Sequence, residues 1–128
     1  MNTTILVAVT DIFFYTKVRD ALRPQGYTLE RIRNQDEVAE KGAAVNPAAL
    51  ILNMNDLTVD AFKALETIRS NPALRALPIL AFANHEEVDT WHRAKELGVT
   101  KIVSRNEFSA RTKDLVDELI HPQPSIQA

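Results

Sequence analysis

The sequence predicts a doubly wound α/β sandwich, in which a parallel five-stranded sheet lies between two layers of helices. Five apolar runs of strand length alternate strictly with five segments of helical period. Three of these runs are continuously apolar, as strands buried on both faces of a parallel sheet are. The 128 residues suit one domain, large enough to bury roughly two-thirds of its unfolded surface.

The predicted strands differ in their apolar patterns. They occupy residues 4–9, 27–32, 48–52, 77–82 and 100–103. The first, third and fourth read TILVAV, AALIL and LPILAF, which are runs typical of central strands. The second alternates between apolar and polar residues, so we expect it at an edge of the sheet.

Each predicted helix has a recognisable start or stop. The helices are expected at about residues 12–23, 36–44, 58–70, 86–97 and 107–120. Asp11 can cap the first, and the second ends ahead of Pro47. Asn71-Pro72 stops the third, and Gly98 is a good left-handed stop for the fourth.

Composition narrows the function classes. The net charge of −2 provides no broad attraction to nucleic acid or to an anionic membrane, and the absence of cysteine excludes thiol chemistry. No run approaches the ~20 apolar residues of a membrane span, and the amino terminus lacks a signal-peptide pattern, so we expect a cytoplasmic protein. Residues 1–121 are expected to form the domain, and residues 122–128 a flexible tail.

The carboxyl ends of the predicted strands carry the candidate site, because ligands of open α/β sheets bind there. The sequence at these ends resembles the receiver domain of two-component response regulators, the CheY-like family, over residues 4–120. The matching segments are ILVAVTD, NPAALILNMNDLTVDAF, IRSNPALRALPILAFANHE and KELGVTKIVSR. The resemblance implies the flavodoxin-like strand order 2-1-3-4-5.

In that family, an Asp after strand three accepts a phosphoryl group and two acids after strand one bind Mg²⁺. A Thr or Ser after strand four and a Lys after strand five contact the phosphate. The resemblance places Asn53 at the acceptor position, Val9 and Thr10 at the acidic pair, Ala83 at the hydroxyl and Arg105 at the lysine. All five positions are therefore substituted.

These substitutions predict that the phosphorylation chemistry is lost. An amide at Asn53 is a far poorer nucleophile than a carboxylate, and Val9 and Thr10 offer no anionic oxygen to Mg²⁺. Ala83 cannot hydrogen-bond a phosphoryl oxygen. We therefore expect no bound metal and no cofactor, and we interpret the chain as a degenerate pseudo-receiver.

The far end of the family's switch is altered as well. Ile102 stands where the family often has a switching Tyr or Phe, and Asn106 replaces a Pro that follows the lysine through a cis bond. A cis bond before Asn106 would cost about 2.5–4 kcal/mol, so we expect a trans bond and a shifted loop. Arg105 keeps the positive charge, although its planar fork differs from a lysine point charge.

The expected function is protein–protein interaction in a two-component or phosphorelay system, without enzymatic activity. The resemblance implies a histidine kinase, a phosphotransfer protein or another receiver or output protein as partner. A homodimer through helix four, strand five and helix five is a further candidate. The candidate contact residues are Phe13, Phe14, Trp91, His92 and Ile102. Neither nucleic acid nor membrane is expected as a partner.

Two alternatives remain open. Asp11 or Asp56 could accept a phosphoryl group in a rearranged Mg²⁺ site, or the crevice could bind a small molecule. Against the first alternative, Asp11 could simply cap helix one, and Asp56 could cap helix three or pair with Arg105. His85, Asp89, His92 and Glu96 are expected on a solvated face of helix four rather than around a metal.

Overall fold

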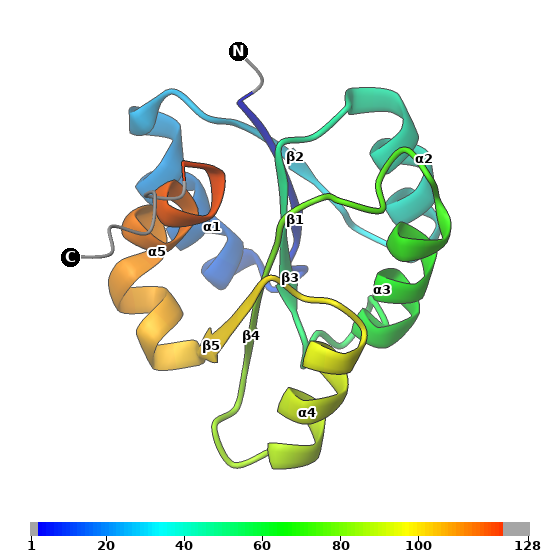
Figure 1. Ribbon diagram of the computed structural model, residues 1–128. Helices are drawn as coiled ribbons and strands as arrows, with labels where there is room; N and C mark the ends of the chain where they lie inside the picture. Colours follow the sequence, from blue (N-terminus) through cyan, green and yellow to red (C-terminus); the bar gives the residue numbers. More distant parts are fainter. Residues whose placement is uncertain (1–2, 122–128) are drawn as a thin grey trace, which may run out of the picture.

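The structure, a computed structural model, describes residues 3–121 and forms the predicted α/β sandwich (Figure 1). A five-stranded sheet has the order β2-β1-β3-β4-β5, with every neighbouring pair parallel. Helices α1 and α5 cover one face, and α2, α3 and α4 cover the other. The expected tail at 122–128 lies outside the described residues.

The observed elements follow the predicted order. The strands are β1 (Thr4–Ala8), β2 (Thr28–Arg31), β3 (Ala49–Asn53), β4 (Ile79–Ala83) and β5 (Lys101–Ser104). The helices are α1 (Ile12–Leu22), α2 (Asp36–Val45), α3 (Ala61–Ser70), α4 (Val88–Glu96) and α5 (Arg105–Ile120), with a short 3-10 turn at Arg23–Gln25. The edge position of β2 is confirmed, since β1 is the only strand within residues 3–121 that pairs with it.

Two apolar clusters lie on the two faces of the sheet. The cluster under α1 and α5 contains three stacked aromatic rings, with centroids 4.9 Å apart for Phe14 and Phe82 and 4.4 Å apart for Phe82 and Phe108. The other cluster joins α2, α3 and α4 to the opposite face. All five residues of β3 and of β4 are buried, which explains their continuous apolar sequences.

Three predicted helix starts are wrong, and one of them is that of α4, which begins at Val88 rather than at residue 86. Helix α3 begins at Ala61 rather than at residue 58, because the Asp60 carboxylate caps it by accepting from the Lys63 N–H at 3.1 Å. Helix α5 begins at Arg105 rather than at residue 107, because the Ser104 hydroxyl accepts from the Glu107 N–H at 3.0 Å. The chain therefore passes from β5 into α5 without a loop.

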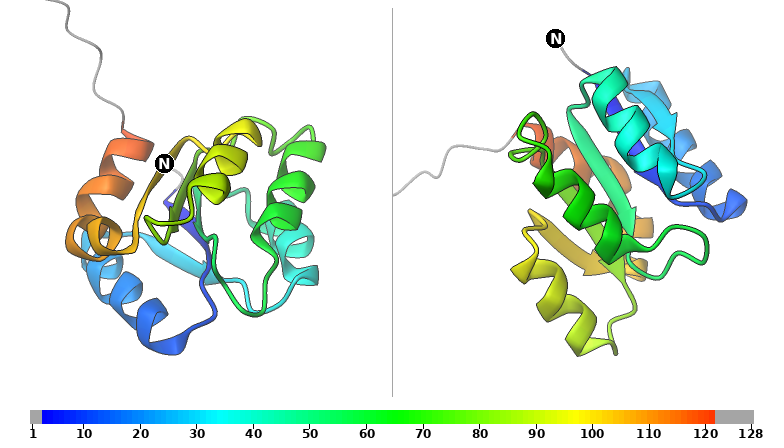
Figure 2. Two further views of the ribbon diagram at one scale, coloured as in Figure 1. Left: turned by 90° about the horizontal axis from the view of Figure 1, so that it is seen from below. Right: turned by 90° about the vertical axis from the view of Figure 1, so that its right-hand side faces the viewer.

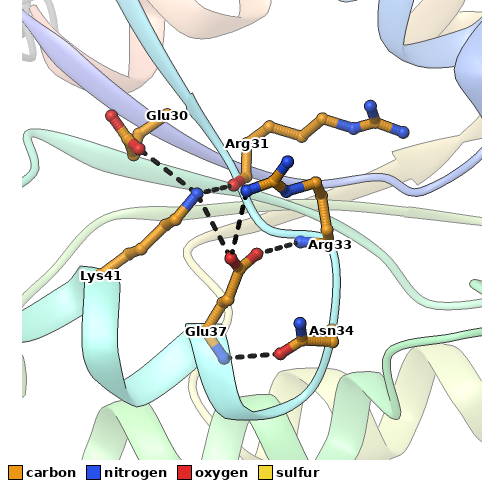
Figure 3. A network of polar contacts seen from close by, with 6 residues as sticks. All are labelled: Glu30, Arg31, Arg33, Asn34, Glu37 and Lys41. Carbon is orange, nitrogen blue, oxygen red and sulfur yellow. Dashed lines mark hydrogen bonds and ion pairs between the residues drawn. The ribbon is translucent and has the colours of Figure 1, made fainter.

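A polar network protects the exposed edge of β2 (Figure 3). Lys41 on α2 donates to the Arg31 carbonyl at 2.5 Å and lies 3.3 Å from a Glu30 carboxylate oxygen. Glu37 accepts from the Arg33 N–H at 2.7 Å, and this hydrogen bond is the main reason why the pKa of Glu37 lies below its ordinary value. Charged side chains placed in this way hinder pairing with a strand of another molecule.

Candidate functional site

A crevice of about 420 Å³ lies at the carboxyl ends of β1 and β3. Figure 2 (left) shows this end of the molecule, where the β1–α1 and β3–α3 connections lie side by side. The lining residues are Thr10, Asp11, Asn53, Asn55, Asp56, Leu57, Thr58 and Arg105. The crevice thus contains both surviving acids, Asp11 and Asp56, together with one arginine.

Only some of the five substituted positions reach this crevice. Thr10, Asn53 and Arg105 line it, whereas Val9, directly after β1, and Ala83, the last residue of β4, are fully buried. Asn53 is 5% exposed, and its side-chain Oδ1 accepts from the Asn55 N–H at 2.9 Å. The amide oxygen at the end of β3 is therefore used to shape the following loop.

Asp56 ties the β1–α1 connection to the β3–α3 connection. Its Oδ1 accepts from the Thr10 N–H at 2.8 Å, and its Oδ2 accepts from the Thr10 hydroxyl at 2.7 Å. The same Oδ2 accepts from the N–H groups of Thr58 at 3.1 Å and Val59 at 3.0 Å. Both predicted roles of Asp56 are wrong, since Asp60 caps α3 and no ion pair joins Asp56 to Arg105 within residues 3–121.

The hydrogen bonds keep Asp56 ionised. Burial by itself raises the pKa of Asp56, but hydrogen bonds from Thr10, Val59 and Thr58 outweigh that effect, and the resulting pKa lies below the ordinary value. A carboxylate that accepts four hydrogen bonds has little capacity left for an incoming electrophile. This side chain is therefore a structural clamp.

Asp11 has the predicted capping role. Its Oδ1 accepts from the N–H groups of Phe13 at 2.9 Å and Phe14 at 3.2 Å, at the start of α1. The predicted trans bond before Asn106 is also confirmed, because no peptide bond in the described part of the chain is cis.

Asn55, which sequence reasoning missed, connects the crevice to α4. Its Oδ1 accepts from the Asn84 N–H at 3.0 Å, and its Nδ2 donates to the Glu87 carboxylate. The Asn84 carbonyl then accepts from the indole N–H of Trp91 at 2.9 Å. The sequence offers one indication of this role, namely that Asn55 lies two residues beyond the end of β3. The asparagine side chain type does not reveal its partners.

Two arginines approach the crevice with different partners. Arg31 donates from Nη2 to the Thr10 carbonyl at 3.0 Å and lies over the Tyr15 ring at 4.9 Å, while its buried Nε has no partner among the described residues. Arg105 lies over the Phe14 ring at 5.0 Å and over the Phe82 ring at 5.9 Å.

The predicted contact residues separate into exposed and buried groups. Phe13 is 84% exposed and His92 is exposed, whereas Trp91 is half-buried. Phe14 belongs to the aromatic stack, and Ile102 is only 8% exposed. The prediction of Ile102 as a surface contact is therefore wrong, because this side chain packs into the cluster beneath α4.

A larger hollow, of about 600 Å³, lies between α1 and α5, near a non-helical residue at Arg111. Its charged side chains are mostly paired. Arg111 lies 3.0 Å from Glu107, and Lys113 lies 3.5 Å from Asp117. In residues 3–121 no three His, Asp or Glu side chains gather closely enough to hold a metal ion. None of the helices in that range combines the length and apolar character that a bilayer crossing requires.

Comparison with solved structures supports the predicted fold. The sequence matches no protein-family model and no curated protein. The structure resembles the phosphorylated cyanobacterial phytochrome response regulator RcpA, with a TM-score of 0.83, 16% identity, and coverage of 98% of this chain and 100% of that one. It also resembles the Vibrio cholerae chemotaxis protein CheY4, with a TM-score of 0.82, 16% identity, and coverage of 93% and 99%.

A third neighbour is the receiver domain of the sensor histidine kinase PA1611 from Pseudomonas aeruginosa, which holds a magnesium ion in its active-site cleft. Its TM-score is 0.81 at 16% identity, with coverage of 94% of this chain and 98% of that one. The chain therefore has the fold of response regulator receiver domains, with the CheY-like strand order 2-1-3-4-5.

Proposed function

We propose that this chain is a signalling module of the receiver fold that binds other proteins and is not switched by phosphorylation. The observation that carries the proposal is the use of the crevice's polar groups by the protein itself. Asn53 supplies an amide at the end of β3, and Asp56 uses its carboxylate to clamp Thr10. No free carboxylate remains at the end of β3 to act as nucleophile.

The same arrangement disfavours Mg²⁺ at this position. Magnesium prefers hard anionic oxygens in octahedral geometry. Val9 is apolar and buried, and the Thr10 hydroxyl is committed to Asp56. Asp11 has one carboxylate oxygen without a partner among residues 3–121, but a single exposed carboxylate is a weak basis for a divalent site.

We favour a protein partner over a small-molecule substrate for this chain. A histidine kinase, a phosphotransfer protein or another receiver or output protein is the partner class that we favour, because the structural neighbours are response regulators and the receiver domain of a histidine kinase. Exposed Phe13 and His92, with half-buried Trp91, are candidate contacts. A homodimer through the α4–β5–α5 face is a second candidate, and a small-molecule sensor a third.

The proposal can be tested by amide chemical shifts during titration with Mg²⁺ and beryllofluoride, which mimics a phosphoryl group on a carboxylate. We expect the amides of Thr10, Asn53 and Arg105 to remain unshifted. Saturable shifts that require both reagents, and that disappear in Asp56→Asn or Asp11→Asn, would instead establish an unconventional acceptor.

A further inference from the structure

Arg105 is a cation whose hydrogen-bonding groups are not used by the protein. A guanidinium has five N–H donors and stays charged at any physiological pH. Arg105 lines the crevice and is half-buried, yet its guanidinium forms no hydrogen bond and no ion pair with residues 3–121. Its guanidinium carbon lies 5.0 Å from the centroid of the Phe14 ring, and its N–H groups have no partner among residues 3–121.

Neither of the acids that line the crevice pairs with this guanidinium within residues 3–121. Asp56 accepts four hydrogen bonds from Thr10, Thr58 and Val59. Asp11 is held at the start of α1 by two backbone N–H groups. Arg105 is also the first residue of α5, where the helix dipole disfavours a cation and favours an anion. The guanidinium is therefore available to pair directly with an acidic group from outside.

One exposed apolar side chain lines the crevice beside this cation, and two more directly follow a lining residue in the chain. Leu57 lines the crevice and is 100% exposed, and Ile12 and Phe13, directly after Asp11, are 52% and 84% exposed. Among the described residues, these are three of the four large apolar side chains that are exposed, and the fourth is Val88 on α4. A cation with exposed apolar side chains on the neighbouring loops fits a protein segment better than a small hydrophilic ion.

We propose that the Arg105 crevice receives an Asp or Glu side chain of a protein partner, and that apolar side chains next to this acid cover Leu57 and Phe13. A carboxylate can pair with the guanidinium through two parallel hydrogen bonds. This inference rests on the proposed function, since it specifies the chemistry of the partner.

The test is selection of short random peptides on the full chain, followed by affinity measurement with a synthetic copy of the enriched peptide. The enriched peptides are expected to carry an acid next to an aliphatic or aromatic residue. Arg105→Gln should weaken binding by roughly tenfold or more, as loss of a charged hydrogen bond predicts. Leu57→Ser should weaken it as well, whereas the exposed Arg75→Gln and Val88→Ser controls should bind normally.

Peptides without acids, a failure to enrich any peptide, or equal affinity for Arg105→Gln would overturn the inference. It would also fail if acetate or inorganic phosphate alone shifted the crevice amides with the affinity of the peptide. If the enriched peptide binds the Val88→Ser variant more weakly, the peptide docks on α4. That result would refute the inference and leave the proposed function intact. A phosphoryl adduct on the chain would refute the proposed function instead.

Discussion

The carboxylate of Asp56 holds the β1–α1 and β3–α3 connections together. It links Thr10 to the β3–α3 connection by direct hydrogen bonds. No metal ion is needed for this link, because the backbone N–H groups and the hydroxyl supply the donors. The crevice is thereby held in one arrangement by residues of the chain itself.

Asp56→Asn should lower stability near neutral pH by about 1–3 kcal/mol, because donors in the crevice lose their acceptor. The pKa of Asp56 is depressed in the folded protein, so its contribution is present above the unfolded value of about 3.9 and is lost as pH falls through the lower folded value. In urea unfolding, the difference in unfolding free energy between wild type and Asp56→Asn should therefore become smaller in acid.

Glu66→Gln is the matched control, since Glu66 is an exposed acid on α3 without a hydrogen bond or ion pair among residues 3–121. Its unfolding should match that of wild type at every pH. A pH-independent deficit in Asp56→Asn would show that the carboxylate charge has no part in the clamp.

At the scale of elements, the loops at the carboxyl edge are connected in series. Asp56 joins the loops after β1 and β3, and Asn55 joins the loop after β3 to the turn that leads into α4. The last bond of the series is the one from the indole N–H of Trp91, on α4, to the Asn84 carbonyl. We infer that these bonds hold α4 in a fixed place relative to the crevice.

Asn55→Ala should release this connection and expose the indole of Trp91. Because Trp91 is the only tryptophan, its fluorescence should shift to longer wavelength and be quenched more strongly by acrylamide. Asn106→Ala, at an exposed residue of α5, should leave the emission unchanged. Unaltered emission in Asn55→Ala would contradict the proposed link to α4.

The alternation of strands and helices, and the edge position of β2, could be predicted because they follow from apolar periodicity. The start of α3 could not, because Asp56 and Asp60 are both plausible caps and only the folded loop decides between them. The part played by Asn55 was equally hidden, since its partners come from a loop about 30 residues later along the chain. Ile102 was misjudged because a position near a strand end does not by itself reveal burial.

For the whole molecule, stability rests on two apolar layers around a sheet whose central strands are buried. The stacked rings of Phe14, Phe82 and Phe108 join α1, β4 and α5 beneath the crevice. Because Arg105 lies over two of these rings, the same layer supports both the core and the candidate binding site.

Phe82→Ala should cost about 3–5 kcal/mol, since it removes a fully buried ring and leaves a cavity. That is a large share of the roughly 5–15 kcal/mol that stabilises a typical domain. Urea unfolding would measure the loss, with Val88→Ala on the exposed face of α4 as control. A loss below about 1 kcal/mol would mean that the ring stack contributes little.

Intact-mass spectrometry after incubation with acetyl phosphate and Mg²⁺ would show whether this chain can be phosphorylated. We expect an unchanged mass, because Asn53 is an amide and the Asp56 carboxylate already accepts four hydrogen bonds. An added phosphoryl group on the wild type, absent from Asp56→Asn or Asp11→Asn, would contradict it.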